Sequence, residues 1–124
     1  MAYRSFEDLE VWQKACRLSV AIFEAFHFCK YPNLTAQIER SGLSVPSNIA
    51  EGAERGGAKE YAQFLKIAKG SAGELRTQLY IAKKLNAIPA EAASCMLAES
   101  SEISAMIEGL RKAILRIKPQ PLKP

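Results

Sequence analysis

The sequence has few of the residues on which metal binding and catalysis usually depend. Its 124 residues include a single histidine, His27, and three widely separated cysteines, Cys16, Cys29 and Cys95. An odd number of cysteines without a Cys-x-x-Cys pair argues against a disulfide framework and a zinc ribbon, and predicts free thiols. Di-iron and di-manganese bundles require Glu-x-x-His on facing helices, which one histidine cannot supply. We therefore expect no metal and no other cofactor.

Long apolar runs are also missing. No segment approaches the roughly 18 to 20 consecutive apolar residues that a membrane-spanning helix requires. The N-terminal stretch MAYRSFEDLE lacks the charged-then-apolar order of a signal peptide. These two absences predict a cytoplasmic protein that does not interact with membranes.

No segment alternates apolar and polar residues as a half-buried strand does, whereas four segments repeat apolar residues at steps of three and four. Ser5, followed by Asp8, resembles a capping box, so we expect the first helix to begin there and to end before Tyr31-Pro32. In this helix the predicted apolar face is broad and is centred on Leu9, Trp12, Cys16, Ser19, Phe23 and Phe26.

The other three helices follow from the same spacing. Their apolar faces run over residues 34–52, 61–82 and 96–117, with Gly56-Gly57 and Asn86 to Pro89 as the connections. Pro46 lies inside the second helix and removes one backbone hydrogen bond, which predicts a kink near Gly42. The sequence thus predicts an all-α, antiparallel up-down four-helix bundle over residues 1–118, followed by a Pro/Lys tail over 119–124.

The charge is segregated along the chain. The net charge is +4, but residues 55–84 hold seven basic and two acidic groups, and residues 111–124 hold five basic groups and no acid. Residues 85–110, in contrast, carry only acids. An anionic partner is therefore expected at the third helix and the C-terminal segment.

Two stretches resemble chemical sites but fit them poorly. Gly52, Gly57 and Lys59 come close to a phosphate-binding loop, but the lysine is one position late, no Ser or Thr follows, and the preceding segment is predicted to be helical. His27 near Cys29 provides two ligands at the end of a helix, which is too few for a metal site and no signature of a nucleophile-base pair. No catalytic residue is predicted.

A polar stripe follows one side of the second helix, where Gln37, Arg40, Ser44, Ser47 and Glu51 recur at steps of three and four, bordered by Asn48. Such a line of hydrogen-bonding groups suits a face that meets another helix or another subunit. We predict that Arg40 pairs with Glu51 or with Glu74 of the third helix. A stripe that is simply solvated is the alternative.

The basic residues of the third helix fall in one sector, with Glu60 and Glu74 opposite. With the basic residues at the C-terminal end of the chain, this flank could follow a phosphate backbone without reading its sequence. The alternative is a solvated face that maintains solubility, because the net charge of +4 is modest and no aromatic stacking platform interleaves with the lysines. The predicted nucleic-acid-binding residues are Arg55, Lys59, Lys66, Lys69, Arg76, Lys83, Arg111, Lys112 and Arg116; Lys84, Lys118 and Lys123 extend the flank.

Three segments resemble a known family: SFEDLEVWQKA at 5–15, QIERSGLSVPSNIAEG at 37–52 and EYAQFLKIAKGSAGEL at 60–75. Together they look like the four-helix-bundle proteins encoded by intervening sequences in bacterial 23S ribosomal RNA genes, a group that includes the accessory variability determinant of diversity-generating retroelements. The resemblance covers most of the chain in the same order.

The resemblance implies a barrel-like homopentamer without an established activity and, as in the retroelement relatives, a basic surface for RNA or DNA and a reverse transcriptase partner. The positions that match the family motif are expected to be structural or interface residues, and with Ser44 they are Gln37, Arg40, Asn48, Glu51, Gly52, Ser71 and Glu74. The sequence therefore favours a non-enzymatic homo-oligomer that associates weakly with nucleic acid. A protein-protein adaptor with no nucleic-acid role is the alternative.

Overall fold

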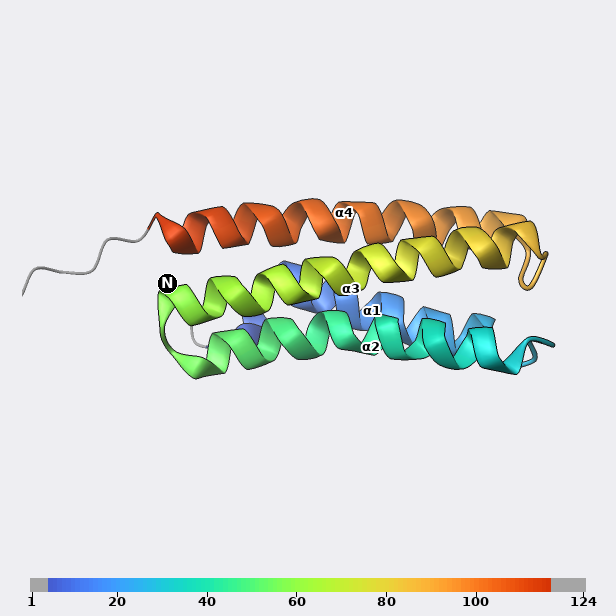
Figure 1. Cartoon of the computed structure of the whole chain (residues 1–124), viewed down its shortest axis with the longest axis horizontal. Coiled ribbons are helices and arrows are strands. Elements are labelled where there is room, and N and C mark those ends of the chain that lie inside the picture. The colour runs from blue at the N-terminus through green and yellow to red at the C-terminus, as the bar shows by residue number, and fades with distance from the viewer. Residues whose placement is uncertain (1–4, 117–124) are drawn as a thin grey trace, which may run out of the picture.

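The protein folds into four long helices packed as an antiparallel bundle (Figure 1). The computed structural model describes residues 5–116; Ile117, Lys118, Lys123 and the predicted tail therefore lie outside the described residues. A short 3-10 turn precedes the bundle, and the elements are η1 (Phe6–Asp8), α1 (Glu10–Ala25), α2 (Pro32–Arg55), α3 (Ala58–Lys84) and α4 (Ala90–Leu115). The predicted all-α four-helix architecture is confirmed.

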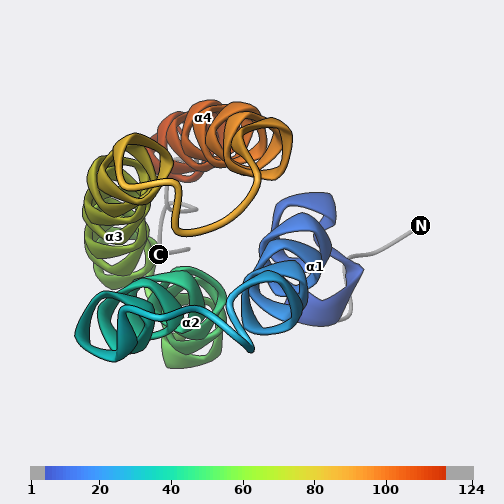
Figure 2. The same ribbon diagram turned by 90° about the vertical axis from the view of Figure 1, so that its right-hand side faces the viewer.

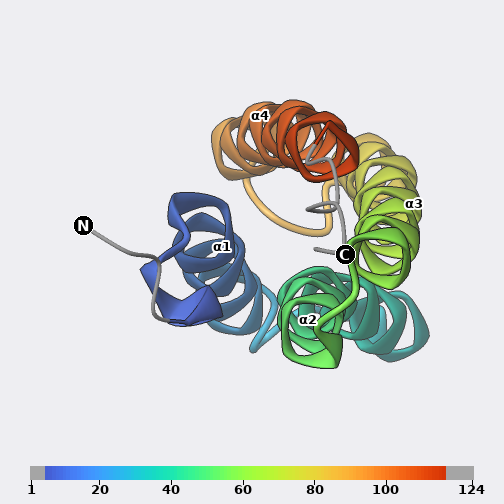
Figure 3. The same ribbon diagram turned by 90° about the vertical axis from the view of Figure 1, so that its left-hand side faces the viewer.

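The helices follow one another around the bundle in chain order (Figures 2 and 3). α2 packs against α1 and α3, and α4 packs against α3 and returns to α1. Because the number of helices is even, the start of α1 and the end of α4 lie at one end of the bundle, while the α1–α2 and α3–α4 connections lie at the other (Figure 1).

The first helix begins later than predicted. The Ser5 hydroxyl does accept a hydrogen bond, but from the backbone N–H of Glu7, and the turn that it caps is η1. Leu9 then adopts an extended conformation, with ψ of 125°, which ends η1 and separates it from α1. The Phe6 ring nevertheless packs edge-on against Trp12 at 5.2 Å between ring centroids, so η1 lies against the helix that it precedes.

The core lies between the four helices and consists of branched and small apolar side chains. The most deeply buried residues include Ile22, Ile38, Leu65, Leu79 and Ile107, contributed by all four helices. On α1 the buried face is rotated from the predicted one. The buried residues are Val11, Ala15, Leu18, Ser19, Ile22 and Phe26, whereas Trp12 and Cys16 are half-buried and Phe23 is 41% exposed.

α2 continues without interruption through Pro46, whose ring is buried. The kink expected near Gly42 stays a prediction. The helix ends as the sequence indicates, because Gly56 adopts a left-handed conformation with φ of 88° and α3 starts two residues later. This tight connection fixes α3 directly beside α2.

Close approach between α2 and α3 depends on Gly52, which is buried. A Cβ atom at this position would lie 2.7 Å from the Cβ of Phe64 and 3.2 Å from the carbonyl oxygen of Tyr61. Real Cβ atoms do not tolerate the shorter distance without movement of the backbone. Gly52 therefore sets the spacing of the two helices near their shared turn.

Candidate nucleic-acid interface

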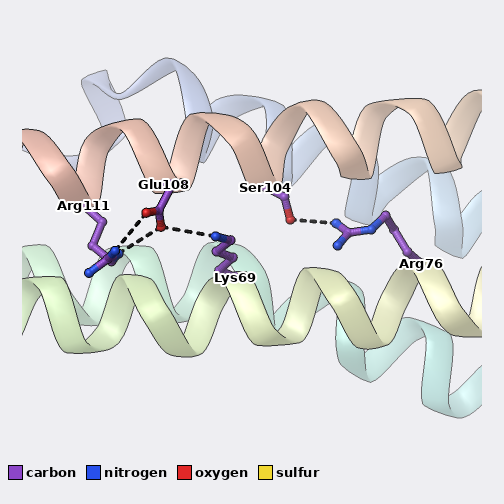
Figure 4. Close-up of polar contacts among 5 residues, drawn as sticks. All are labelled: Lys69, Arg76, Ser104, Glu108 and Arg111. Carbon is purple, nitrogen blue, oxygen red and sulfur yellow. Dashed lines mark hydrogen bonds and ion pairs between the residues drawn. The ribbon is translucent and has the colours of Figure 1, made fainter.

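Polar side chains connect α3 and α4 at several points along the seam between the two helices. Lys69 Nζ lies 3.3 Å from a carboxylate oxygen of Glu108, and further along the seam the Arg76 guanidinium donates to Ser104 Oγ at 2.6 Å (Figure 4). Both basic side chains come from α3 and reach across to α4. The predicted basic sector of α3 therefore faces the seam between these two helices.

Glu108 is the acidic centre of this seam. Arg111 binds it with two hydrogen bonds, from Nε at 2.9 Å and from a terminal nitrogen at 2.8 Å, and Lys69 adds the third contact (Figure 4). The hydrogen bond from Arg111, and next that from Lys69, lower the pKa of Glu108 to about 2. Glu108 is thus ionised at neutral pH; it pairs with Arg111 within α4 and links α4 to α3 through Lys69.

Arg76 occupies a different environment because it is half-buried and has no carboxylate partner among residues 5–116. Its guanidinium donates to the Ser104 hydroxyl and, at 3.5 Å, to the backbone carbonyl of Ser100. These neutral acceptors orient the cation without cancelling its charge. Arg76 therefore contributes a positive charge held in place along the seam.

Arg55 does not share this environment. It forms ion pairs with Glu51 at 2.9 Å and Glu60 at 3.2 Å, and its guanidinium lies over the Phe64 ring. The hydrogen bond to Glu51 is the main cause of the raised pKa of Arg55. Although Arg55 belongs to the sector predicted for nucleic-acid binding, its charge is compensated at the α2–α3 turn.

The remaining predicted basic residues form no ion pair within the described part of the chain. They are half-exposed or exposed, and are Lys59, Lys66, Lys83, Lys112 and Arg116, with Lys84 beside Lys83. Since Lys69 contacts Glu108 on α4, the N-terminal half of α3 lies beside the C-terminal half of α4, which brings the two basic segments of the sequence together. We call the following set the basic flank: Lys59, Lys66, Lys69, Arg76, Lys83, Lys84, Arg111, Lys112 and Arg116.

Several acids of α3 and α4 lie away from the basic flank. Glu60 pairs with Arg55 on the α2 side, and Glu99 and Glu102 line a cleft of about 200 Å³ between α4 and α1. In that cleft Glu102 forms an ion pair with Lys14. Part of the run of acids that the sequence shows in α4 is therefore directed toward α1.

The predicted structural residues of α2 and α3 meet in part. Ser44 and Ser71 share a hydrogen bond of 2.8 Å between their hydroxyls, and Asn48 donates to the Ser44 carbonyl at 2.8 Å and to its hydroxyl at 3.0 Å. Together with Gly52, these residues form the polar and close-packed part of the contact between the two helices. The polar side of α2 was predicted to meet another helix, and Ser44, Asn48 and Gly52 of α2 do lie against α3 or beside a residue that does.

The predicted pairing of Arg40 is wrong within the chain. Glu51 pairs with Arg55, one helical turn away, because side chains at positions i and i+4 of a helix are neighbours. Glu74 and Arg40 are exposed and form no ion pair with any residue in the described range, and Gln37 is also exposed. These three side chains are left on the surface of α2 and α3.

No group of three or more histidine, cysteine, aspartate or glutamate side chains within residues 5–116 could hold a metal ion. Glu24 does stand three residues before His27 and gives one Glu-x-x-His spacing, but no facing helix supplies a second. His27 packs against the ring of Phe28 instead. None of the described helices is long and apolar enough to cross a membrane.

Comparison with known proteins identifies a family and a related fold. The family model described as 23S rRNA-intervening sequence protein matches residues 7–109. The chain belongs to this family. A search of curated proteins found no match.

A solved structure similar to this family member comes from Bacteroides thetaiotaomicron and is described as a protein of unknown function from the S23 ribosomal protein family. The two chains share 24% sequence identity with a TM-score of 0.76, and the match covers 82% of this chain and 98% of the other. At this identity the similarity establishes the fold.

Sequence reasoning missed an aromatic residue on the basic flank. Tyr80 lies four residues after Arg76 and three before Lys83, and its side chain is 60% exposed. The expected lack of an aromatic stacking platform among the lysines did not take this single exposed ring into account. The helical spacing alone could have indicated it, since positions 76, 80 and 83 share one side of a helix.

An apolar groove over the seam between α1 and α2 was also missed. It has a volume of about 350 Å³ and is lined by Phe6, Trp12, Cys16, Leu43, Pro46, Ser47 and Ala50. Val20, 57% exposed, follows Cys16 by one helical turn and extends this surface. We call these residues the apolar face. The broad apolar pattern of the first helix could have indicated it, because such a width exceeds what one core needs.

Proposed function

We propose that this protein is a non-enzymatic homo-oligomer that binds RNA or DNA weakly and without sequence preference through the basic flank. The observation that carries this proposal is the charge balance along α3 and α4. Six predicted residues of the flank have no ion-pair partner within residues 5–116, and Glu108 already contacts two other flank residues. Such a surface retains an excess of positive charge available to phosphates.

The chemistry of the flank fits backbone binding better than base reading. Exposed lysines neutralise phosphates and release counterions, which gives affinity that depends on salt and not on sequence. The lysine side chains come from two neighbouring helices and form a strip, not a single protruding element that could enter a groove. We therefore propose contacts with the phosphate backbone.

A catalytic role has no support in the electrostatics. The carboxylate with a strongly shifted pKa, Glu108, is shifted downward by its cations. A general acid or base working near neutral pH requires a shift in the opposite direction. We propose that Glu108 is structural and that the protein catalyses no reaction.

The experiment is binding of labelled structured RNA and duplex DNA to the purified protein across a salt series. The test variant is Lys66→Gln combined with Lys112→Gln, because both lysines are exposed and neither forms an ion pair within the described range. The matched control, Arg17→Gln with Lys30→Gln, removes the same charge from residues off the flank.

We expect the flank variant to bind more weakly and to lower the slope of log affinity against log salt by about 0.7 to 0.9 for each phosphate that it no longer neutralises. The control is expected to change the slope little. Two unrelated sequences of equal length should bind equally. Equal weakening of binding in both variants, or no binding even at low salt, would contradict the proposed role of the flank.

We further propose that copies of the chain assemble through the apolar face, as a homopentamer. Large exposed apolar side chains, Val20 and Leu43 among them, lie beside the groove, and an apolar surface of this kind typically marks a protein contact. Light scattering is expected to give a pentamer for the natural sequence and smaller species for Leu43→Glu. Ile67→Glu, which changes an exposed residue of α3, is the control.

The apolar face also favours a second candidate function, that of a protein-protein adaptor. In that case the groove holds a different protein, such as a reverse transcriptase, and the basic flank serves solubility. A complex with a protein partner that is insensitive to salt and does not form with Leu43→Glu would favour the adaptor. Nucleic-acid binding that weakens with rising salt would favour the first proposal.

A further inference from the structure

A pocket lies where the basic flank reaches the α3–α4 connection. It has a volume of about 460 Å³ and is lined by Tyr80, Lys83, Lys84, Asn86 and Ala90. Its lining residues come from the end of α3, the start of α4 and the connection between them. Figure 1 shows that connection at the same end of the bundle as the α1–α2 connection. The fold does not require these side chains for its own contacts, because they form no hydrogen bond, ion pair or ring contact within residues 5–116.

The three kinds of group in this pocket match the face of a base, the edge of a base and a phosphate. The exposed ring of Tyr80 offers an aromatic surface on which a base can stack. Lys83 and Lys84 supply cations for a phosphate, and the Asn86 amide can both donate to and accept from the polar edge of a base. Asn86 is held in a left-handed conformation, with φ of 54°, at the turn beside Ala87.

We propose that this pocket stacks one base of a single-stranded nucleic acid on Tyr80 while the rest of the strand follows the basic flank. The inference rests on the proposed function and names its ligand class. The bases of a duplex cannot bind in this pocket, because they are stacked on one another and paired along their edges. An unpaired base presents a free face and a free edge.

From the pocket, the basic flank continues along α3 toward the N-terminal end of that helix, and a bound strand would follow it. Arg76 lies one turn before Tyr80, and Lys69 and Lys66 lie further along the same side of α3. From position 66 to position 84 the helix rises by about 27 Å, at roughly 1.5 Å per residue. This length accommodates several nucleotides, which agrees with the site sizes of about 4 to 16 nucleotides found in other single-strand binders.

The experiment compares Tyr80→Leu with Tyr80→Phe, using labelled oligouridine as the single strand and a hairpin duplex of equal nucleotide count. The two strands of the hairpin are joined by a non-nucleotide linker, so that it contains no unpaired base. Tyr80 is exposed, so both variants are expected to keep the helical content of the natural chain, which circular dichroism checks. The leucine variant should bind oligouridine about ten-fold more weakly, because it loses the stacking of one base on an aromatic ring; ten-fold corresponds to about 1.4 kcal/mol. The phenylalanine variant should retain binding within about two-fold, and hairpin binding should not change. Uridine monophosphate should bind far more weakly than the strand, because it cannot reach along the flank.

The outcomes separate this inference from the proposed function. If Lys66→Gln with Lys112→Gln weakens binding but Tyr80→Leu has no effect on oligouridine, the flank is correct and the stacking pocket is wrong. If Tyr80→Leu weakens hairpin and oligouridine binding equally, selective stacking is likewise wrong. If no nucleic acid binds at low salt, the proposed function fails and this inference fails with it.

Discussion

Ser44 and Ser71 share a hydrogen bond of 2.8 Å across the α2–α3 contact, and the Asn48 amide donates to the same Ser44 hydroxyl. All three side chains are buried or half-buried. A buried polar group is costly when it lacks a partner, so this small network favours one register of α2 against α3 over its neighbours.

Asn48→Ala should destabilise the bundle. It removes the two hydrogen bonds to Ser44 and leaves that hydroxyl with Ser71 alone. The expected decrease in the free energy of unfolding is about 1 kcal/mol, measured by urea denaturation. Ser101→Ala, at an exposed position of α4, is the control and should change stability by less than about 0.5 kcal/mol. Equal effects of the two substitutions would show that the network contributes nothing specific.

Substituting alanine for two different glycines of the bundle should change its stability in opposite directions. Gly52→Ala forces a Cβ into contact with Phe64 and should cost about 1 to 3 kcal/mol. Gly70→Ala, inside α3, meets no atom within 4 Å and should stabilise the helix by about 0.5 to 1 kcal/mol. Thermal unfolding of both variants checks the pair, and a stable Gly52→Ala protein would contradict the close α2–α3 approach.

Glu108 should make stability depend on pH in a defined window. Its folded pKa, about 2, is below the ordinary value of 4.5, so the unfolded chain binds the proton more readily. The stabilisation is therefore fully present above about pH 4.5 and disappears as the pH falls toward 2. Glu108→Gln should lower stability at neutral pH, and the difference from the natural chain should shrink as the solution is acidified. A difference that stays constant from neutral pH down to about pH 3 would contradict this assignment.

The same substitution should affect nucleic-acid binding in the opposite sense. Glu108→Gln removes the acid inside the basic flank and releases Arg111 and Lys69 from their ion pairs. Affinity for structured RNA at low salt should therefore rise. Glu99→Gln removes the same charge from the cleft between α1 and α4 and should raise affinity less. A larger effect of Glu99→Gln would place the binding surface elsewhere.

The sequence predicted the fold well because local signals agree with one another. Gly56 ends α2 with a positive φ that glycine adopts without strain, and Pro89, with φ of −55°, directly precedes α4. The start of α1 was misplaced because the Ser5 cap serves a 3-10 turn, and the capping pattern does not distinguish the two kinds of helix.

The candidate site was less predictable because its electrostatics depend on residues distant in sequence. Helical spacing places Lys69 and Arg76 on one flank, but nothing local indicates that Glu108, 39 residues after Lys69, lies beside it. Arg55 was assigned to the flank by its angle on the helix, whereas its carboxylate partners lie on both sides of a glycine turn. The side of a helix on which a residue lies can be predicted from the spacing of the sequence. Which residue of a neighbouring helix it pairs with depends on how the two helices are aligned in the folded structure.

Because the number of helices is even, the two ends of the bundle differ, and a label can be placed at one end alone. Arg116 lies at the end of the molecule where the described chain begins and ends, and the Tyr80 pocket lies at the opposite end, beside Ala90. The 26 residues of α4 separate these points by about 39 Å, at roughly 1.5 Å per residue. A fluorophore attached near position 116 leaves the pocket unobstructed and is within range of energy transfer to a labelled strand. Comparing energy transfer to a strand labelled at its 5′ end with transfer to one labelled at its 3′ end would then show in which direction a bound strand lies along the bundle.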